Sequence, residues 1–160
     1  MGVGDALKEV AIETSTLNYY NSFGQLIWSE PRGIAAGYRW PQYSIDRGDL
    51  QIVLLAAVES RIGPGKVHTS HRLVSFEQTA GAVTARFVDR VSGRALPDRR
   101  GDVLIGADGI HSAVRAQLYP GEGAPVSSGR IQWRGTLEAS PFLDGRTHVT
   151  VGSKIGRAHV

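Results

Sequence analysis

Residues 106–109 read glycine-alanine-aspartate-glycine, a composition that suits a backbone corner lying beside a ligand. The apolar run 103–105 before them is typical of a strand covered on both faces in a parallel sheet, and 110–118 after them is compatible with a helix. Ligands of open α/β sheets lie outside the carboxyl ends of strands, where glycine permits close approach and helix N-termini offer free N–H groups. The spacing therefore places Asp108 and Gly109 at a candidate ligand site.

The Asp-Gly dipeptide is also common in ordinary turns, so the spacing alone equally fits a strand-to-helix connection without a ligand. The whole string GADGIHSAVR, residues 106–115, is more specific. It resembles the Asp-Gly motif of the class A FAD-dependent aromatic monooxygenases, the flavoprotein hydroxylases. The resemblance implies that this turn lies near the FAD pyrophosphate and the path of the pyridine nucleotide.

The resemblance covers residues 5–152. WSEPRG at 28–33, PQYSI at 41–45 and WRGTLE at 133–138 are similar to the phenazine-modifying branch of the family, typified by 5-methylphenazine-1-carboxylate 1-monooxygenase. The fold class that this implies is α/β. It consists of an incomplete FAD-binding Rossmann-like domain, of the para-hydroxybenzoate-hydroxylase type, and the start of a β-sheet substrate domain.

We accordingly expect a partial FAD-binding domain at 1–126, without its first βαβ unit and with a hairpin and loop insertion at 16–44 toward the substrate side. Residues 127–153 are expected to begin the substrate-domain sheet. No GxGxxG turn follows a strand before Asp5, so we expect the chain to be the central fragment of a longer protein. The codons of 154–160 can be written to match a sequencing adapter, so this tail is expected to be non-native.

Arg47, at a helix start, is implied by the resemblance to reach the FAD phosphates. A guanidinium suits that task because it stays charged and bonds phosphate oxygens in pairs; an ordinary surface arginine is the alternative. Relatives usually carry a histidine where this chain has Asp46, which caps a helix well but whose charge could weaken flavin binding. Leu73 matches a strand position whose backbone meets the adenine end in relatives, although its side chain fits plain core packing.

At the corner itself, Gly109 is expected to allow the close approach of the cofactor. Asp108 would repel a pyrophosphate unless cations or waters intervene, so we interpret it as an organiser of the site and not as a phosphate ligand. Ser112 is placed to cap the following helix with its hydroxyl. Arg115 could pair with Asp108 or with Asp102.

Apolar spacing predicts the elements that position these residues. Asp46 occupies an N-cap position before an apolar face that starts at Leu50, and Gly63-Pro64 ends that helix. The other expected elements are a helical tail at 5–10, hairpins at 17–28 and 67–91, and strands at 102–105, 129–137 and 147–151.

Composition narrows the class of protein. The 160 residues are 41% hydrophobic and include no cysteine, which fits a cytoplasmic protein and excludes thiolate metal sites. The net charge of +3 is spread among interspersed arginines and aspartates, which argues against nucleic acid as a partner. No apolar run is long enough for a membrane span. His68 and His71 should point to opposite faces of a strand, so no metal site is expected.

The resemblance implies a parent enzyme in which NADH or NADPH reduces FAD, and molecular oxygen then hydroxylates a small aromatic or heteroaromatic substrate such as a phenazine. Because the cofactor carries this chemistry, no catalytic residue is assigned. The alternatives are a related flavin-dependent epoxidase, halogenase or reductase, an inert fragment, and a small basic nucleic-acid-binding module. The isolated chain is expected to be molten and to bind no FAD, because cut sheets leave apolar surface in water. Nothing in the sequence indicates an oligomeric state.

Overall fold

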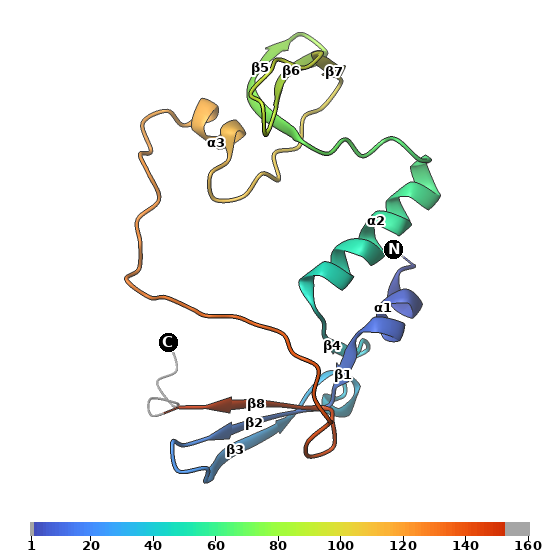
Figure 1. Ribbon diagram of the computed structural model, residues 1–160, viewed down its shortest axis with the longest axis vertical. Coiled ribbons are helices and arrows are strands. Elements are labelled where there is room, and N and C mark those ends of the chain that lie inside the picture. The colour runs from blue at the N-terminus through green and yellow to red at the C-terminus, as the bar shows by residue number, and fades with distance from the viewer. Residues whose placement is uncertain (1, 153–160) are drawn as a thin grey trace. The chain divides into compact units, whose positions relative to one another are not determined.

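The computed structural model describes residues 2–152. The predicted adapter-derived tail, 154–160, lies outside these residues. The chain divides into two compact units, one formed by Met1–Pro64 with the chain from Arg134 onward, the other by Gly65–Trp133. The elements of each unit are labelled in Figure 1. The predicted domain boundary at 126 concerns the complete domains of the family and stays a prediction.

In the first unit, α2 (Arg47–Ile62) is the longest element. It begins as predicted, because Oδ1 of Asp46 accepts a hydrogen bond from the N–H of Gly48 at 2.7 Å. It ends as predicted at Gly63, which has a positive φ of 88°. The shorter elements before it are α1 (Gly4–Val10), β1 (Ile12–Thr14), the 3-10 helix η1 (Gly33–Ala36) and β4 (Gln42–Ser44), which pairs antiparallel with β1.

A three-stranded sheet completes this unit, with β2 (Thr16–Tyr20) between β3 (Leu26–Pro31) and β8 (Thr147–Val151). The predicted hairpin is confirmed: β2 and β3 are antiparallel, and the turn is closed by Asn21, whose Oδ1 accepts from the N–H of Phe23 and of Gln25. β8 lies parallel to β2, as Figure 1 shows. The sheet thus joins a segment near residue 20 to one near residue 150.

The second unit contains the predicted hairpin of β5 (His71–Thr79) and β6 (Ala82–Asp89), followed by β7 (Arg99–Gly101) on the far side of β6. The register shifts by one residue between Leu73 and Ser75, so β5 bulges there. Helix α3 (Ala113–Leu118) contacts β5. It begins three residues after the predicted start at 110.

Two predicted strands are wrong. Residues 102–105 and 129–137 have no strand pairing in the structure of 2–152, although 147–151 does. A strand needs the backbone of a neighbour to hydrogen bond, and neither run is paired in a sheet among residues 2–152. Most of their apolar side chains face solvent instead: Val103 is 76% exposed and Trp133 is 92% exposed.

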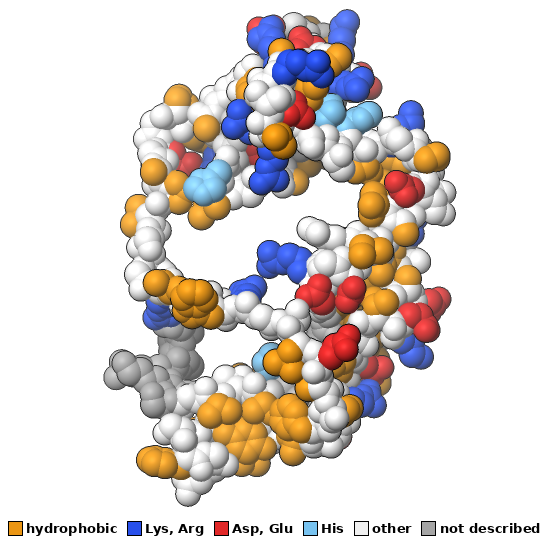
Figure 2. Space-filling model, in the orientation of Figure 1, with side chains coloured by type: hydrophobic (Ala, Val, Ile, Leu, Met, Phe, Trp, Pro, Cys, Tyr) orange, Lys and Arg blue, Asp and Glu red, His pale blue; other side chains and the backbone are white. Residues whose placement is uncertain are grey.

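The core is small in both units. The buried apolar side chains are Leu17 in the first unit and Ala82, Val83 and Ala85 in the second. Figure 2 shows hydrophobic side chains open to solvent over the β3–β2–β8 sheet and along α2, which has no buried residue. None of the helices within residues 2–152 combines the length and the apolar character that a membrane crossing requires.

Candidate functional site

Asp108 closes the corner before α3 with its own carboxylate. Its oxygens accept hydrogen bonds from the Ser112 hydroxyl, from the N–H of Ala113 at 2.6 Å and from the N–H of Val114 at 3.5 Å. Ser112 caps the helix as predicted, because its Oγ accepts from the N–H of Arg115 at 3.0 Å. These bonds, that from the Ser112 hydroxyl above all, lower the pKa of Asp108 below its ordinary value of 3.8.

The free N–H groups that the sequence predicted at the start of this helix are therefore not free. The first three helical N–H groups are bonded to Asp108 and Ser112. The corner itself differs. For Gly109, Ile110 and His111, the structure of residues 2–152 shows no acceptor for the backbone N–H. Donors for a ligand thus lie in the turn before α3 and not in the helix.

Two glycines shape the corner for different reasons. Gly109 has φ +78°, which favours glycine, and a Cβ there would meet no atom within 4 Å, so that side of the turn is open. A Cβ on Gly106 would lie 3.0 Å from Cβ of Val114 and 3.1 Å from both of its methyl carbons. Gly106 thus permits the segment before the corner to approach α3.

Arg115 pairs with Glu122 and not with Asp108 or Asp102, contrary to the sequence prediction. Its Nε donates to Oε2 of Glu122 at 2.5 Å, and its Nη2 donates to Oε1. This pairing raises the pKa of Arg115 and lowers that of Glu122. Asp108 needs no such cation, because three donors within its own turn already satisfy it.

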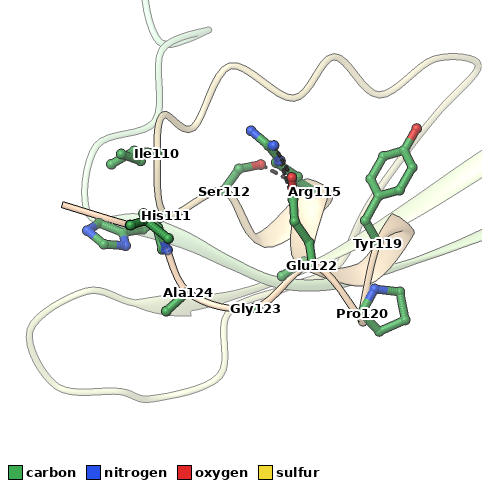
Figure 3. Close-up of a pocket in the computed structure, with 12 residues that line it drawn as sticks. Ile110, His111, Ser112, Arg115, Tyr119, Pro120, Glu122, Gly123 and Ala124 are labelled. Atoms are coloured by element: carbon green, nitrogen blue, oxygen red, sulfur yellow. Dashed lines mark hydrogen bonds and ion pairs between the residues drawn. The ribbon is translucent and has the colours of Figure 1, made fainter. Parts of the chain in front are cut away.

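An open groove of about 840 Å³ lies beside this ion pair. Figure 3 shows the side chains of Arg115 and Glu122 meeting above α3, with Tyr119 on the adjoining turn. The groove continues along the backbone at Ile110 and His111, two of the residues whose N–H groups have no acceptor within residues 2–152. It is therefore a surface where a ligand could reach the corner.

Arg47 lies in the other unit, at the first position of α2, and is exposed. Among residues 2–152 its guanidinium makes no ion pair. Its neighbour Asp46, where the resemblance implies a histidine, uses its carboxylate to cap α2 at Gly48. The aspartate is thus accommodated by the fold, and the arginine remains available to an anion.

Leu73 lies in β5, half-buried and paired with Phe87, at the start of the bulge. The structure brings Leu73, Asp108 and Gly109 into one unit, in which α3 contacts β5. The contact includes a residue that sequence reasoning missed. Gln117 on α3 bonds the backbone of β5. No sequence signal marks it, since a polar residue in a short helix is normally solvated.

The prediction that His68 and His71 point to opposite faces of a strand is wrong. The rings of His68 and His71 lie 5.3 Å apart between centroids, because the strand begins only at His71 and does not impose opposite faces on the pair. Within residues 2–152, no group of three or more His, Cys, Asp or Glu side chains could hold a metal ion.

Comparison with known proteins identifies the family. Residues 14–154 match the family described as FAD binding domain. The chain is 43% identical over 150 residues to phenazine 1,6-dicarboxylic acid hydroxylase PhzS of Lysobacter antibioticus, a match that covers 93% of this chain and 37% of that protein. It is 32% identical to 3-hydroxybenzoate 6-hydroxylase of Polaromonas naphthalenivorans, over 89% of this chain and 34% of that protein. The chain spans about a third of the length of these relatives.

The fold of the chain is also similar to solved structures of flavin-dependent enzymes. The flavin-dependent monooxygenase PieE, in complex with FAD and substrate, is 26% identical with a TM-score of 0.58, over 73% of this chain and 22% of that protein. A salicylate hydroxylase substrate complex is 25% identical with a TM-score of 0.54, over 79% of this chain and 29% of that protein. The chain belongs to the FAD-binding-domain family, and the relatives that it matches include flavoprotein aromatic hydroxylases, as the Asp-Gly motif predicted.

The described residues fit an anionic nucleotide such as FAD. Arg47 offers an exposed guanidinium without an ion-pair partner in residues 2–152. The corner at Gly109 offers open space and N–H groups without acceptors in the same part of the chain. The negative charge of Asp108, the feature least compatible with a pyrophosphate, is already stabilised by three hydrogen bonds.

Proposed function

We propose that this chain forms part of the FAD site of an NAD(P)H-consuming monooxygenase that hydroxylates a small aromatic or heteroaromatic compound with molecular oxygen. The observation that carries the proposal is the glycine corner at 108–109, open on one side and held in place by its own carboxylate, in a chain of the FAD-binding family. When bound, FAD supplies electron transfer from the reduced nicotinamide and the activation of oxygen.

The protein residues bind and orient, and none is assigned as catalytic acid or base. Arg47 holds phosphate oxygens, for which its fork of donors is suited. Gly109 lets the backbone approach the nucleotide, and Asp108 fixes the turn so that the N–H groups of 109–111 keep their direction. The backbone at Leu73 meets the adenine end.

The substrate class follows from the relatives and is a proposal for this chain. PhzS is named for a phenazine dicarboxylic acid and the Polaromonas relative for a hydroxybenzoate. Both names describe planar aromatic acids. We infer that a phenazine carboxylic acid is the first substrate to test and that monocyclic hydroxybenzoates are the second.

Flavin binding through Arg47 is the first test of this proposal. In the protein produced from its complete gene, Arg47→Ala should raise the Kd of FAD about tenfold or more, because a charge-assisted phosphate contact is lost. Arg47→Lys should restore part of the affinity, since it keeps the charge without the planar fork. Fluorescence quenching of FAD in an equilibrium titration measures both.

Arg90→Ala is the matched control, since it removes one positive charge from an exposed arginine on the turn after β6. It should leave the Kd of FAD unchanged. If the wild-type protein bound no FAD, or if it bound FAD but consumed NADH and NADPH equally slowly with and without aromatic acids, the proposed monooxygenase activity would be wrong.

A further inference from the structure

Gln117 makes the two backbone hydrogen bonds that a neighbouring strand would make. β5 lies at the edge of its sheet, in the order β5-β6-β7. The N–H of Phe76 in β5 donates to Oε1 of Gln117 at 3.0 Å, and Nε2 of Gln117 donates to the carbonyl oxygen of Phe76 at 2.6 Å. A side-chain amide can do this because it carries both a donor and an acceptor.

This pair of bonds joins two segments far apart in the sequence. Gln117 belongs to α3, whose first turn is held by Asp108. Phe76 belongs to the strand that carries Leu73, just beyond the bulge. Within residues 2–152, these are the side-chain hydrogen bonds that connect α3 to β5.

Apolar packing covers this connection only in part. Val114 of α3 and Phe76 of β5 are half-buried, whereas Leu118, the neighbour of Gln117 on α3, is 57% exposed and Val103 is 76% exposed. Phe76 of β5 and Val114 and Leu118 of α3 line one groove. The amide of Gln117 is therefore the directional contact that sets where α3 lies against β5.

We propose that Gln117 is a positioning residue for the cofactor: its amide holds the corner at 108–109 at a fixed place relative to Leu73, so that both segments meet one nucleotide together. The proposal rests on the proposed function, because it requires FAD as the ligand. It assigns to Gln117 no contact with the cofactor. Gln117 instead affects FAD binding indirectly, because α3 carries the corner at 108–109 and β5 carries Leu73.

Replacement of the amide tests this role in the protein produced from its complete gene. Gln117→Ala should raise the Kd of FAD about threefold to tenfold, the effect of a modest hydrogen-bonded contact. Hydrogen exchange, followed by mass spectrometry, should become faster in 71–79 and in 106–115. Loss of helix cannot explain such changes, because alanine is the better helix former. Gln78→Ala is the control, as Gln78 lies in the same strand and its side chain makes no hydrogen bond within residues 2–152.

Gln117→Glu provides a signature that a general packing defect would not give. Its ionised carboxylate still accepts from the N–H of Phe76 but has no proton for the carbonyl oxygen, whereas the protonated acid has one. The adjacent carbonyl oxygen should raise the pKa of this carboxyl. FAD affinity of Gln117→Glu should therefore be low at pH 8 and recover toward the wild-type value as the pH is lowered toward about 5, while Gln117→Ala shows no recovery.

The outcomes separate the two proposals. A wild-type protein that binds no FAD overturns the proposed function and this inference with it. Faster exchange in Gln117→Ala with an unchanged Kd of FAD overturns the positioning role and leaves the proposed function standing. Unchanged exchange, or a Gln117→Glu variant without recovery at low pH, shows that the amide does not hold α3 against β5.

Discussion

At the scale of single residues, the corner before α3 combines a satisfied carboxylate with unsatisfied backbone donors. Asp108 takes up the hydrogen-bonding capacity of the helix start, and the N–H groups of 109–111 are left without acceptors among residues 2–152. These bonds fix the direction of the carboxylate and keep it ionised, because donors to a carboxylate favour its charged form. The hydrogen bonds of Asp108 therefore explain how it could organise the site: they hold the turn, and they leave the N–H groups of 109–111 to a ligand.

Gly106 offers a prediction at this scale. Gly106→Ala should destabilise the protein by about 1–3 kcal/mol and weaken FAD binding, since the new methyl would overlap the rigid, β-branched side chain of Val114. Denaturant unfolding and FAD titration of the protein from its complete gene measure the two effects.

A second substitution tests whether a steric clash causes this loss of stability. Val114→Ala removes the two methyl carbons that would lie 3.1 Å from the added Cβ but keeps the Cβ at 3.0 Å, so the double variant should regain part of the stability lost in Gly106→Ala. Additive losses in the double variant would show that the close approach of Gly106 to Val114 is not the constraint.

At the scale of elements, the sequence predicted those whose signals are local. Asp46 and Gly63 mark both ends of α2 through their own capping interactions. The hairpin of β5 and β6 closes at a glycine turn, and its strands are neighbours in the chain. The strands predicted at 102–105 and 129–137 are absent from the structure of residues 2–152. An apolar pattern indicates that a segment is suited to a strand, but it does not show whether a neighbouring strand is there to pair with it. Gln117 escaped prediction because its partner is a backbone position 41 residues away.

The cap of α3 should depend on pH in a defined direction. The pKa of Asp108 is lowered in the folded protein, so its hydrogen bonds contribute stability above the ordinary aspartate pKa of 3.8, and this contribution is lost as the pH falls through the lower folded value. The difference in Tm between wild type and Asp108→Asn should thus stay constant from pH 7 to about 5 and shrink below about pH 4.

Asp102→Asn provides the matched comparison, because Asp102 lies six residues earlier and its carboxylate accepts no hydrogen bond within residues 2–152. Its Tm should follow the wild-type curve at each pH. A gap between wild type and Asp108→Asn that persisted unchanged to pH 3 would contradict a charge-assisted cap.

At the scale of the whole molecule, the small buried core of each unit bears on what the chain does alone. Three of the four buried apolar residues lie in the single strand β6, and no large side chain is fully buried among the described residues. Each ordered residue costs about 1–2 kcal/mol of backbone entropy, which so little burial cannot offset.

The isolated 160-residue chain should therefore lack a cooperative thermal transition, bind a hydrophobic dye and retain no FAD on gel filtration, because the capped corner and Arg47 are held in units without a sufficient core. The protein from its complete gene should melt cooperatively and carry the yellow flavin under the same conditions. Calorimetry and the absorbance of the eluted peak compare the two. If the isolated chain melted in one sharp transition and eluted with bound FAD, packing among its own residues would suffice for the site.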